Sequence, residues 1–287
     1  MPIAPLLPLS AEERRLLPED APLEEADVAV VESFADLPEG TWARAPRLRW
    51  IVSLAAGADH VPFAKLPPQA RVVSLHGPGA PAIAEHALAL LLAAFRRIPQ
   101  QDRALREGRF DQVVAGRRVA GSEALVLGAG AIGMRIAARA DALDMRVRVW
   151  RRGGDLDALL ADADAIVIAL PLTRDTKGLI DAGRLARMKE DAVLVNVARG
   201  KIVQREALLD HLRAHLRFTY ATDVWWRYPP EAALPENLIG TPHVAALVEG
   251  WREERVAEAA RVARALSATG KAPEGARVEA PSDYDFR

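Results

Sequence analysis

Short runs of Val, Ile and Leu alternate with segments of helical periodicity along most of the chain. Such runs are typical of parallel strands buried on both faces, and the segments between them of helices that cover the sheet. The segment 81–98 opens at a proline and is apolar on most sides, which predicts a buried helix. The pattern therefore predicts an α/β protein. Its expected strands are 27–33, 48–54, 70–76, 123–128, 146–150, 165–171, 192–198 and 218–224, and a last helix, 247–270, ends at Gly270.

The rhythm of these elements changes along the chain. From Glu123 onward, strands and helices alternate more regularly than they do before it. We therefore expect two lobes, with the chain passing between them near residues 80 and 255. The length of 287 residues is compatible with this division, because it allows either one large domain or two ordinary ones.

Composition excludes several classes of protein. The 38 basic residues balance 39 acidic ones, so no overall field favours nucleic acid or an anionic membrane as a partner. The chain has no cysteine, which rules out disulfides, thiolate catalysis and cysteine-ligated metal sites. Residues 1–15 lack a basic flank and contain prolines, unlike a signal peptide. The longest apolar stretch, from Ala87, is far shorter than the roughly 20 residues of a membrane span. We expect a cytoplasmic, globular protein.

Three glycines follow the strand 123–128 and form the pattern G-x-G-x-x-G at the start of a helix. The first allows a tight turn, the second lets a pyrophosphate approach the backbone, and the third lets helix and strand pack closely. The helix amino terminus then faces the phosphates. A glycine-rich turn without a ligand can show the bare motif. Here a second strand follows the helix, and the complete unit favours a dinucleotide site at Gly128, Ala129, Gly130, Ala131, Ile132 and Gly133.

Arg151 and Arg152 stand at the end of that second strand, where such units usually carry an acidic residue. An acid there accepts hydrogen bonds from the ribose hydroxyls and repels a 2′-phosphate, whereas a planar guanidinium suits phosphate. The alternative is that both arginines are solvated surface charges beside Gly153 and Gly154. We predict NADP as the cofactor. NAD stays possible, because the charge at one position does not decide between the two.

Several stretches resemble the D-isomer-specific 2-hydroxyacid dehydrogenase family, in the right order along the chain. The resemblance implies two Rossmann-like lobes: a doubly wound parallel sheet in a cofactor domain, 80–254, and a smaller flavodoxin-like substrate domain, 1–79 plus 255–287. It also implies a homodimer formed through the cofactor domains. The matching stretches are "LRWIVSLAAGADHV" (48–61), "IAEHALALLLAAFRRI" (83–98), "ALPLTRDTKGLI" (169–180), "VNVARGKIVQREAL" (195–208) and "NLIGTPHVAA" (237–246).

Matched by motif, Arg199 corresponds to the family's substrate-binding arginine and His243 to its catalytic acid/base. The residue types suit these roles. A guanidinium can hold the carboxylate and carbonyl oxygens of a 2-keto acid, and an imidazolium is a natural proton donor near neutral pH. The resemblance also implies a substrate-carboxylate loop at Ala56, Gly57 and Ala58, and cofactor contacts at Leu170, Pro171, Thr176, Val197, Ala198 and Asp223, the last facing the nicotinamide carboxamide.

The chain departs from the family pattern near the histidine. The family usually has "DVFxxEP", in which the glutamate pairs with the catalytic histidine, and this chain has "DVWWRYPP". Tyr228 thus stands in the glutamate's place as a third candidate catalytic residue. It orients His243 without adding a charge. The rival prediction is that Glu231 or Glu249 replaces the missing carboxylate.

Two further departures concern the first lobe. Little sequence lies between Met1 and Asp27 to supply the usual opening strand and helix, and His76 stands where an asparagine is common. His211 and His215 lie four apart on an expected helix, a spacing that can bind a metal. With no third ligand apparent, we expect a solvated face and no metal.

The predicted function is hydride transfer between NADP(H) and a small 2-keto or 2-hydroxy acid of the glyoxylate or hydroxypyruvate type. Two alternatives stay open. One is formate-dehydrogenase-like chemistry on the same fold, since those members carry glutamine in the glutamate's place. The other is a dinucleotide-binding regulatory protein without catalysis, although the presence of both Arg199 and His243 argues against it.

Overall fold

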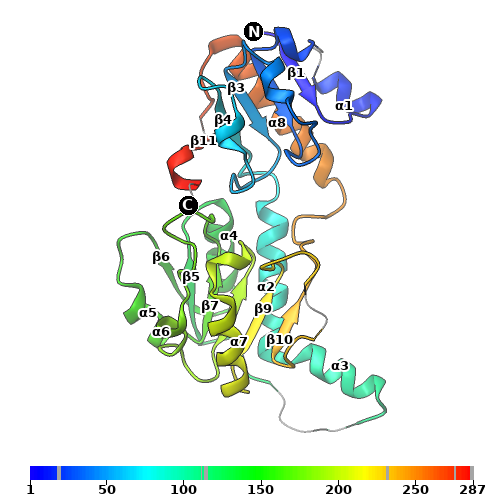
Figure 1. Cartoon of the computed structure of the whole chain (residues 1–287). Coiled ribbons are helices and arrows are strands. Elements are labelled where there is room, and N and C mark those ends of the chain that lie inside the picture. The colour runs from blue at the N-terminus through cyan, green and yellow to red at the C-terminus, as the bar shows by residue number, and fades with distance from the viewer. Residues whose placement is uncertain (18–20, 111, 113–115, 231–232, 275, 285–287) are drawn as a thin grey trace. The chain divides into compact units, whose positions relative to one another are not determined.

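The computed structural model of the chain divides into two compact units (Figure 1). It describes all residues except 18–20, 111, 113–115, 231–232, 275 and 285–287. The smaller unit is 1–79 with 248–287, and the larger is 80–247. The second crossing therefore falls at Val248, before the position near 255 that the sequence pattern indicated. The reason is that helix α8 (Trp251–Thr269) buries Val256 and Ala259 in the core of the smaller unit.

The larger unit is built on a six-stranded, wholly parallel sheet, and the predicted doubly wound fold is confirmed. The chain passes from β5 (Glu123–Leu127) to β6 (Arg146–Trp150) on one side and then returns to β7 (Ala165–Ile168) on the other. The carboxyl ends of β5 and β7 thus form a topological switch point, the place where such sheets bind ligands. In spatial order the strands are β10 (Leu238–Gly240), β9 (Thr219–Thr222), β8 (Val193–Asn196), β7 (Ala165–Ile168), β5 (Glu123–Leu127) and β6 (Arg146–Trp150).

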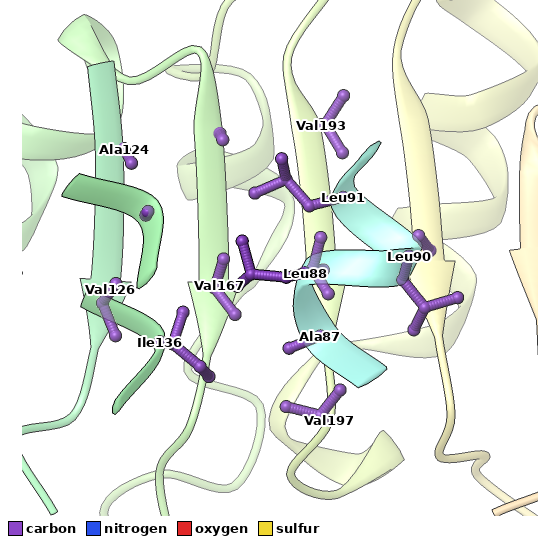
Figure 2. Packing of buried hydrophobic residues seen from close by; sticks show 14 of the residues in the cluster. Ala87, Leu88, Leu90, Leu91, Ala124, Val126, Ile136, Val167, Val193 and Val197 are labelled. Atoms are coloured by element: carbon purple, nitrogen blue, oxygen red, sulfur yellow. The ribbon is translucent and has the colours of Figure 1, made fainter. Parts of the chain in front are cut away.

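Helix α2 (Ala80–Arg96) packs on this sheet, as its nearly continuous apolar sequence predicts. Figure 2 shows Leu88 and Leu91 of α2 beside Val167 and Val193 of the central strands. Each buried leucine contributes about 1.5–3 kcal/mol of hydrophobic stabilisation. The unit's other helices are α3 (Ile98–Arg106), α4 (Ala131–Asp141), α5 (Leu156–Asp162), α6 (Ala182–Leu185) and α7 (Arg205–Ala214), with the 3-10 turn η4 (Gly200–Ile202).

The smaller unit has a five-stranded sheet whose strands follow one another in the order of the sequence. The last strand, β11 (Arg277–Val278), is antiparallel to β4 (Arg71–Ser74), and the others are parallel. Among the described residues the order lacks the reversal of a flavodoxin sheet. Helix α8 covers one face, and Gly270 caps its carboxyl end, where the sequence predicts that the helix stops. The strands are β1 (Ile3–Leu6), β2 (Val28–Val31), β3 (Trp50–Ser53), β4 (Arg71–Ser74) and β11 (Arg277–Val278), and 3-10 turns lie at η1 (Leu23–Glu25), η2 (Thr41–Arg44), η3 (Phe63–Lys65) and η5 (Pro281–Tyr284).

The opening strand and helix of the smaller unit are both present, although the sequence before Asp27 is short and left this question open. Strand β1 has 4 residues and helix α1 (Ala11–Leu16) has 6. So short a helix forms because Ser10 and Glu13 make a capping box, and Arg252 of α8 contacts the Glu13 carboxylate at 3.0 Å. Within the described residues, no helix combines the length and the apolar character that crossing a bilayer requires.

Candidate active site

The glycine turn of the larger unit has the strand–turn–helix geometry that its sequence predicts. Gly128 follows β5 with φ of +118°, and a Cβ there would lie 2.5 Å from the Ala169 carbonyl oxygen. A Cβ on Gly133 would lie 1.9 Å from the Gly128 carbonyl oxygen, so only glycine allows α4 to approach the strand this closely. Gly130, the N-cap of α4, has open space around its Cα and makes no side-chain cap. A phosphate can therefore approach the first amides of α4.

The loop after β7 forms the other side of the switch point. Leu170 lies against the turn, since its Cδ2 would be 3.2 Å from a Cβ on Gly128. The Thr176 hydroxyl donates to the carbonyl oxygen of Pro171 at 2.6 Å and accepts from the Thr173 amide at 2.8 Å. Thr176 is 5% exposed, so its hydroxyl shapes this loop. Its contact with a cofactor stays a prediction.

Arg151 and Arg152 begin a tight turn directly after β6. The turn is closed by Trp150, whose indole donates to the Gly154 carbonyl at 2.9 Å. Both arginines are exposed, and Arg152 contacts the carboxylate of Asp175 at 3.2 Å. An exposed pair of this kind contributes about 0–1 kcal/mol, so Arg152 can exchange this partner for a bound anion.

The turn after β8 holds Arg199, and the side chain of Asn196 fixes that turn. Asn196 is fully buried; its amide oxygen accepts from the Ala198 N–H at 3.0 Å and its Nδ2 donates to the Arg199 carbonyl at 3.0 Å. The same Nδ2 faces the hydroxyl of Tyr220 at 3.1 Å, and burial raises the pKa of Tyr220 to about 12. Val197 and Ala198 are buried, and Arg199, half-buried, is the charged group that this turn presents.

The segment that carries His243 is tied to Asp223, which follows β9 and is 1% exposed. One carboxylate oxygen of Asp223 accepts from the Thr241 hydroxyl at 2.6 Å and the Val244 N–H at 2.9 Å; the other accepts from the Ala245 N–H at 2.9 Å. These bonds hold the backbone on both sides of His243, which has a left-handed φ of +62°. Asp223 therefore fixes the histidine turn, and its contact with a nicotinamide carboxamide stays a prediction.

A further histidine supports this arrangement from α2. Because the Asp223 carboxylate only accepts, the Thr241 hydroxyl must donate to it and accept from the Nε2–H of His86 at 2.8 Å. Sequence reasoning missed His86 and Asn196 as supporting residues. Their signals lay inside quoted motifs, but the partners of each are distant in the chain, and no local pattern pairs them.

Tyr228 lies beside His243, as its position in the motif predicts, but it makes a different contact from a carboxylate. The two rings stack with centroids 5.5 Å apart and planes inclined by 24°. The Tyr228 hydroxyl oxygen accepts from the Trp225 amide at 3.2 Å. Of the rival carboxylates, Glu231 lies outside the described residues, and Glu249 is exposed in the smaller unit.

The predicted substrate loop lies in the smaller unit, directly after β3. Ala56 and Gly57 are half-buried and Ala58 is buried. Across the described part of the chain, no hydrogen bond takes up the amides of these three residues, whereas the Ala55 amide donates to the Ser53 hydroxyl at 3.3 Å. A run of amides without an internal acceptor suits an anion.

The two histidines at helical spacing do not lie on the solvated face that we expected. His211 and His215 are half-buried, with ring centroids 4.3 Å apart, and His211 also meets Phe218 edge-on. Burial, together with the neighbouring His215, lowers the pKa of His211 to about 4. The described residues contain no group of three or more His, Cys, Asp or Glu placed to hold a metal.

Comparisons with known proteins agree with this geometry. Residues 88–245 match the model of the NAD-binding domain of D-isomer specific 2-hydroxyacid dehydrogenases. A glyoxylate reductase from Pyrococcus furiosus is 30% identical over 90% of this chain and 84% of its own length. A D-3-phosphoglycerate dehydrogenase from Archaeoglobus fulgidus is 35% identical over 70% of this chain, which spans only 42% of that protein.

Solved structures extend the likeness to the whole chain. A protein from Pyrobaculum aerophilum named as a candidate formate dehydrogenase superposes with a TM-score of 0.87, at 33% identity over 99% of this chain and 100% of its own. A D-isomer specific 2-hydroxyacid dehydrogenase from Xanthobacter autotrophicus, solved with NADPH, gives 0.82 at 26% identity over 96% and 97% of the two chains.

A Rossmann sheet with an open glycine turn at its switch point, and with an arginine after β8 and a histidine after β10 at the same edge of the sheet, is the architecture of a nicotinamide-dependent oxidoreductase. The family model that matches residues 88–245, together with relatives at 30% identity or more, identifies the family within this class of enzymes. The chain belongs to the D-isomer specific 2-hydroxyacid dehydrogenase family, whose members are NAD(P)-dependent enzymes.

Proposed function

We propose that this protein reduces a small 2-keto acid of the glyoxylate or hydroxypyruvate type with NADPH. The observation that carries the proposal is the edge formed by three neighbouring parallel strands. Arg199 follows β8, Asp223 follows β9 and His243 follows β10. A cationic group for the acid and a proton donor for its carbonyl oxygen thus come from one rigid sheet.

The residues divide the chemistry between them. The open space at Gly130 and the uncapped start of α4 fit the pyrophosphate of a dinucleotide, whose reduced nicotinamide supplies the hydride when it is bound. Arg199 binds the carboxylate and polarises the carbonyl, and His243 donates a proton to the oxygen as negative charge develops on it. Asn196 and Asp223 hold these two groups in place through backbone hydrogen bonds.

The test is direct. The purified protein is mixed with NADPH or NADH and with glyoxylate or hydroxypyruvate, and the loss of nicotinamide absorbance is followed. Turnover with either acid supports the proposal. A second candidate, formate oxidation, is favoured by the likeness to the Pyrobaculum aerophilum protein. It is tested by mixing the protein with formate and NADP⁺ or NAD⁺ and following the gain of nicotinamide absorbance. No turnover with any pair would favour a dinucleotide-binding protein without catalysis.

The cofactor proposal rests on Arg151 and Arg152, which present two exposed guanidinium groups at the end of β6. This is the strand end at which dinucleotide folds read the ribose. Two cations there favour a 2′-phosphate, so we propose NADP(H) as the preferred cofactor, with NAD(H) as the weaker one.

Tyr228 offers a test of how His243 is supported. Keto-acid reduction needs a protonated imidazole, so its rate falls as pH rises past the point where His243 loses its proton. A carboxylate in place of the stacked phenol would stabilise the imidazolium. Tyr228→Glu should therefore move the basic limb of the pH profile of kcat/KM upward by about one unit.

Tyr228→Phe is the matched control, because it keeps the ring contact with His243 and removes the hydroxyl. It should slow turnover about twofold or threefold and leave the limb in place. A limb unmoved by Tyr228→Glu but shifted by Glu249→Gln or Glu231→Gln would assign the support of His243 to a carboxylate instead.

We also propose a homodimer formed through the larger unit. Helix α3, labelled in Figure 1, has no buried residue. Ile98 and Leu105 on this helix and Phe110 after it are 54%, 58% and 75% exposed. Exposed apolar side chains on one short segment suit an interface. The 31.1 kDa chain should therefore run at about twice its mass in light scattering coupled to size exclusion.

The double variant Leu105→Asp/Phe110→Asp should run as a monomer. The control is Leu216→Asp, which places the same charge after α7 at a side chain as exposed as Phe110, and this variant should remain a dimer. A wild-type protein that already runs as a monomer would contradict the proposal.

A further inference from the structure

The smaller unit contains a buried carboxylate, Glu279, whose side chain is 0% exposed. Burial alone would raise the pKa of this carboxyl, but hydrogen bonds from neighbouring side chains and the charge of Arg277 lower it below its usual value. Glu279 is therefore ionised at neutral pH. Its partners are the Tyr284 hydroxyl at 2.6 Å, His76 Nε2 at 3.1 Å, Arg277 Nε at 3.2 Å and the Ser74 hydroxyl.

His76 lies next to the predicted substrate loop. Strands β3 and β4 are parallel neighbours in which Ser53 pairs with Ser74, so both end at the same edge of the sheet. The Leu75 amide then donates to the Ala55 carbonyl at 3.2 Å. The residues that follow this bond are His76 on one segment and Ala56 on the other. A group bound by the amides of the loop therefore has His76 as a neighbour.

The partners of Glu279 decide which atom of His76 is available. The Glu279 carboxylate only accepts hydrogen bonds, so the ring nitrogen that faces it must donate. The Nε2 atom of His76 lies 3.1 Å from Glu279 and 3.2 Å from the Ser74 hydroxyl, so Nε2 holds the hydrogen. The bond made by one ring nitrogen sets the tautomer of the other. Nδ1 is then an acceptor, on a side chain that is 29% exposed.

The segment that carries β11 and Glu279 is held on the sheet without His76. Strand β11 already pairs with β4, the Glu279 amide donates to the Val72 carbonyl at 2.9 Å, and Tyr284 and Ser74 donate to the carboxylate. These contacts hold β11 and Glu279 in place without His76. The bond between Glu279 and His76 therefore serves mainly to fix the orientation of the imidazole ring.

We propose that His76, held by Glu279, selects the substrate by accepting a hydrogen bond at Nδ1 from a hydroxyl on the carbon next to the keto group. This inference rests on the proposed function and narrows it to 3-hydroxy-2-keto acids, of which hydroxypyruvate is the smallest. Glyoxylate has no such carbon, and pyruvate carries a methyl group there. Glu279 is a positioning residue in this arrangement.

The experiment compares pyruvate with hydroxypyruvate, which differ by that one hydroxyl, in the full-length protein with NADPH. His76→Leu should lower kcat/KM for hydroxypyruvate about tenfold and leave the value for pyruvate within about threefold. Glu279→Gln should lower the ratio of the two values in the same direction. Tyr284→Phe is the control, because it removes a donor to the other carboxylate oxygen of Glu279, and it should leave the ratio unchanged.

Equal losses with both substrates in His76→Leu would show a structural role and overturn the inference, as would an unchanged ratio. His76→Asn, a smaller change, gives the same comparison if the leucine variant does not fold. In either case a wild type that reduces both acids leaves the proposed function standing. A wild type that reduces glyoxylate but neither of these two acids overturns this inference alone, and one that reduces none of the three overturns the proposed function as well.

Discussion

Replacing Arg199 with alanine is expected to lower kcat/KM for the keto acid about a thousandfold while leaving the affinity for NADPH nearly unchanged. The loss is large because the guanidinium has two tasks, holding the carboxylate and stabilising the charge that develops on the carbonyl oxygen. The turn itself should survive, since Asn196 holds it through the Ala198 amide and the Arg199 carbonyl, which alanine retains.

The measurement is steady-state kinetics together with a titration of NADPH fluorescence. Arg199→Lys keeps the charge but not the planar fork, so it should recover only part of the loss. Lys201→Ala, which removes an exposed cation two residues away, is the matched control and should stay within about twofold of wild type. Near-normal turnover in Arg199→Ala would remove this residue from the mechanism.

Most of the fold follows from local sequence patterns. The apolar runs of the larger unit became β5, β7 and β8, because a strand buried on both faces is apolar along most of its length. The glycine turn was equally readable, since Gly128 and Gly133 occupy positions where any Cβ would collide with backbone. Where one physical requirement allows one residue type, the sequence alone predicts the structure.

The opening of the chain was harder to interpret because its elements are short. Strand β1 and helix α1 have too few residues to show a period, and α1 depends on a capping box and on Arg252, which lies more than 200 residues away. The expected solvated histidine pair failed for a related reason. His211 is half-buried against Phe218, a contact that depends on where the chain turns after α7.

The sequence predicted the reacting groups of the site, but it did not predict the side chains that hold those groups in place. Arg199 and His243 lie inside motifs, but the bonds that hold them come from elsewhere: Asp223 reaches Val244, and His86 of α2 reaches Thr241. The network at Glu279 lies further still from any pattern, because its contacts with Ser74 and His76 span 205 and 203 residues. Side-chain hydrogen bonds of this range are set by packing, which no local period records.

The largest expected change in cofactor choice comes from the strand end that carries Arg151 and Arg152. Losing one charge-assisted contact to a 2′-phosphate costs about 1.5–3 kcal/mol, or one to two decades in affinity. Arg151→Ala should lose one such contact. Arg152→Ala should lose another and also leave the Asp175 carboxylate without its 3.2 Å partner, so that a negative charge faces the phosphate. The double variant should therefore reverse the preference toward NADH.

The measured quantity is the ratio of kcat/KM for NADPH to that for NADH, with the keto acid saturating. Arg148→Ala is the control, because Arg148 is an exposed arginine on the same strand, paired with Glu123 and Asp162. Removing Arg148 should leave the ratio unchanged, because Arg148 lies within β6 and not at the end of the strand where the ribose binds. NADH turnover should stay near wild type in all variants, because NADH lacks the phosphate that the arginines bind. A wild-type protein that already prefers NADH would assign both arginines to the solvated surface, and the ribose would then be bound by other groups of this turn.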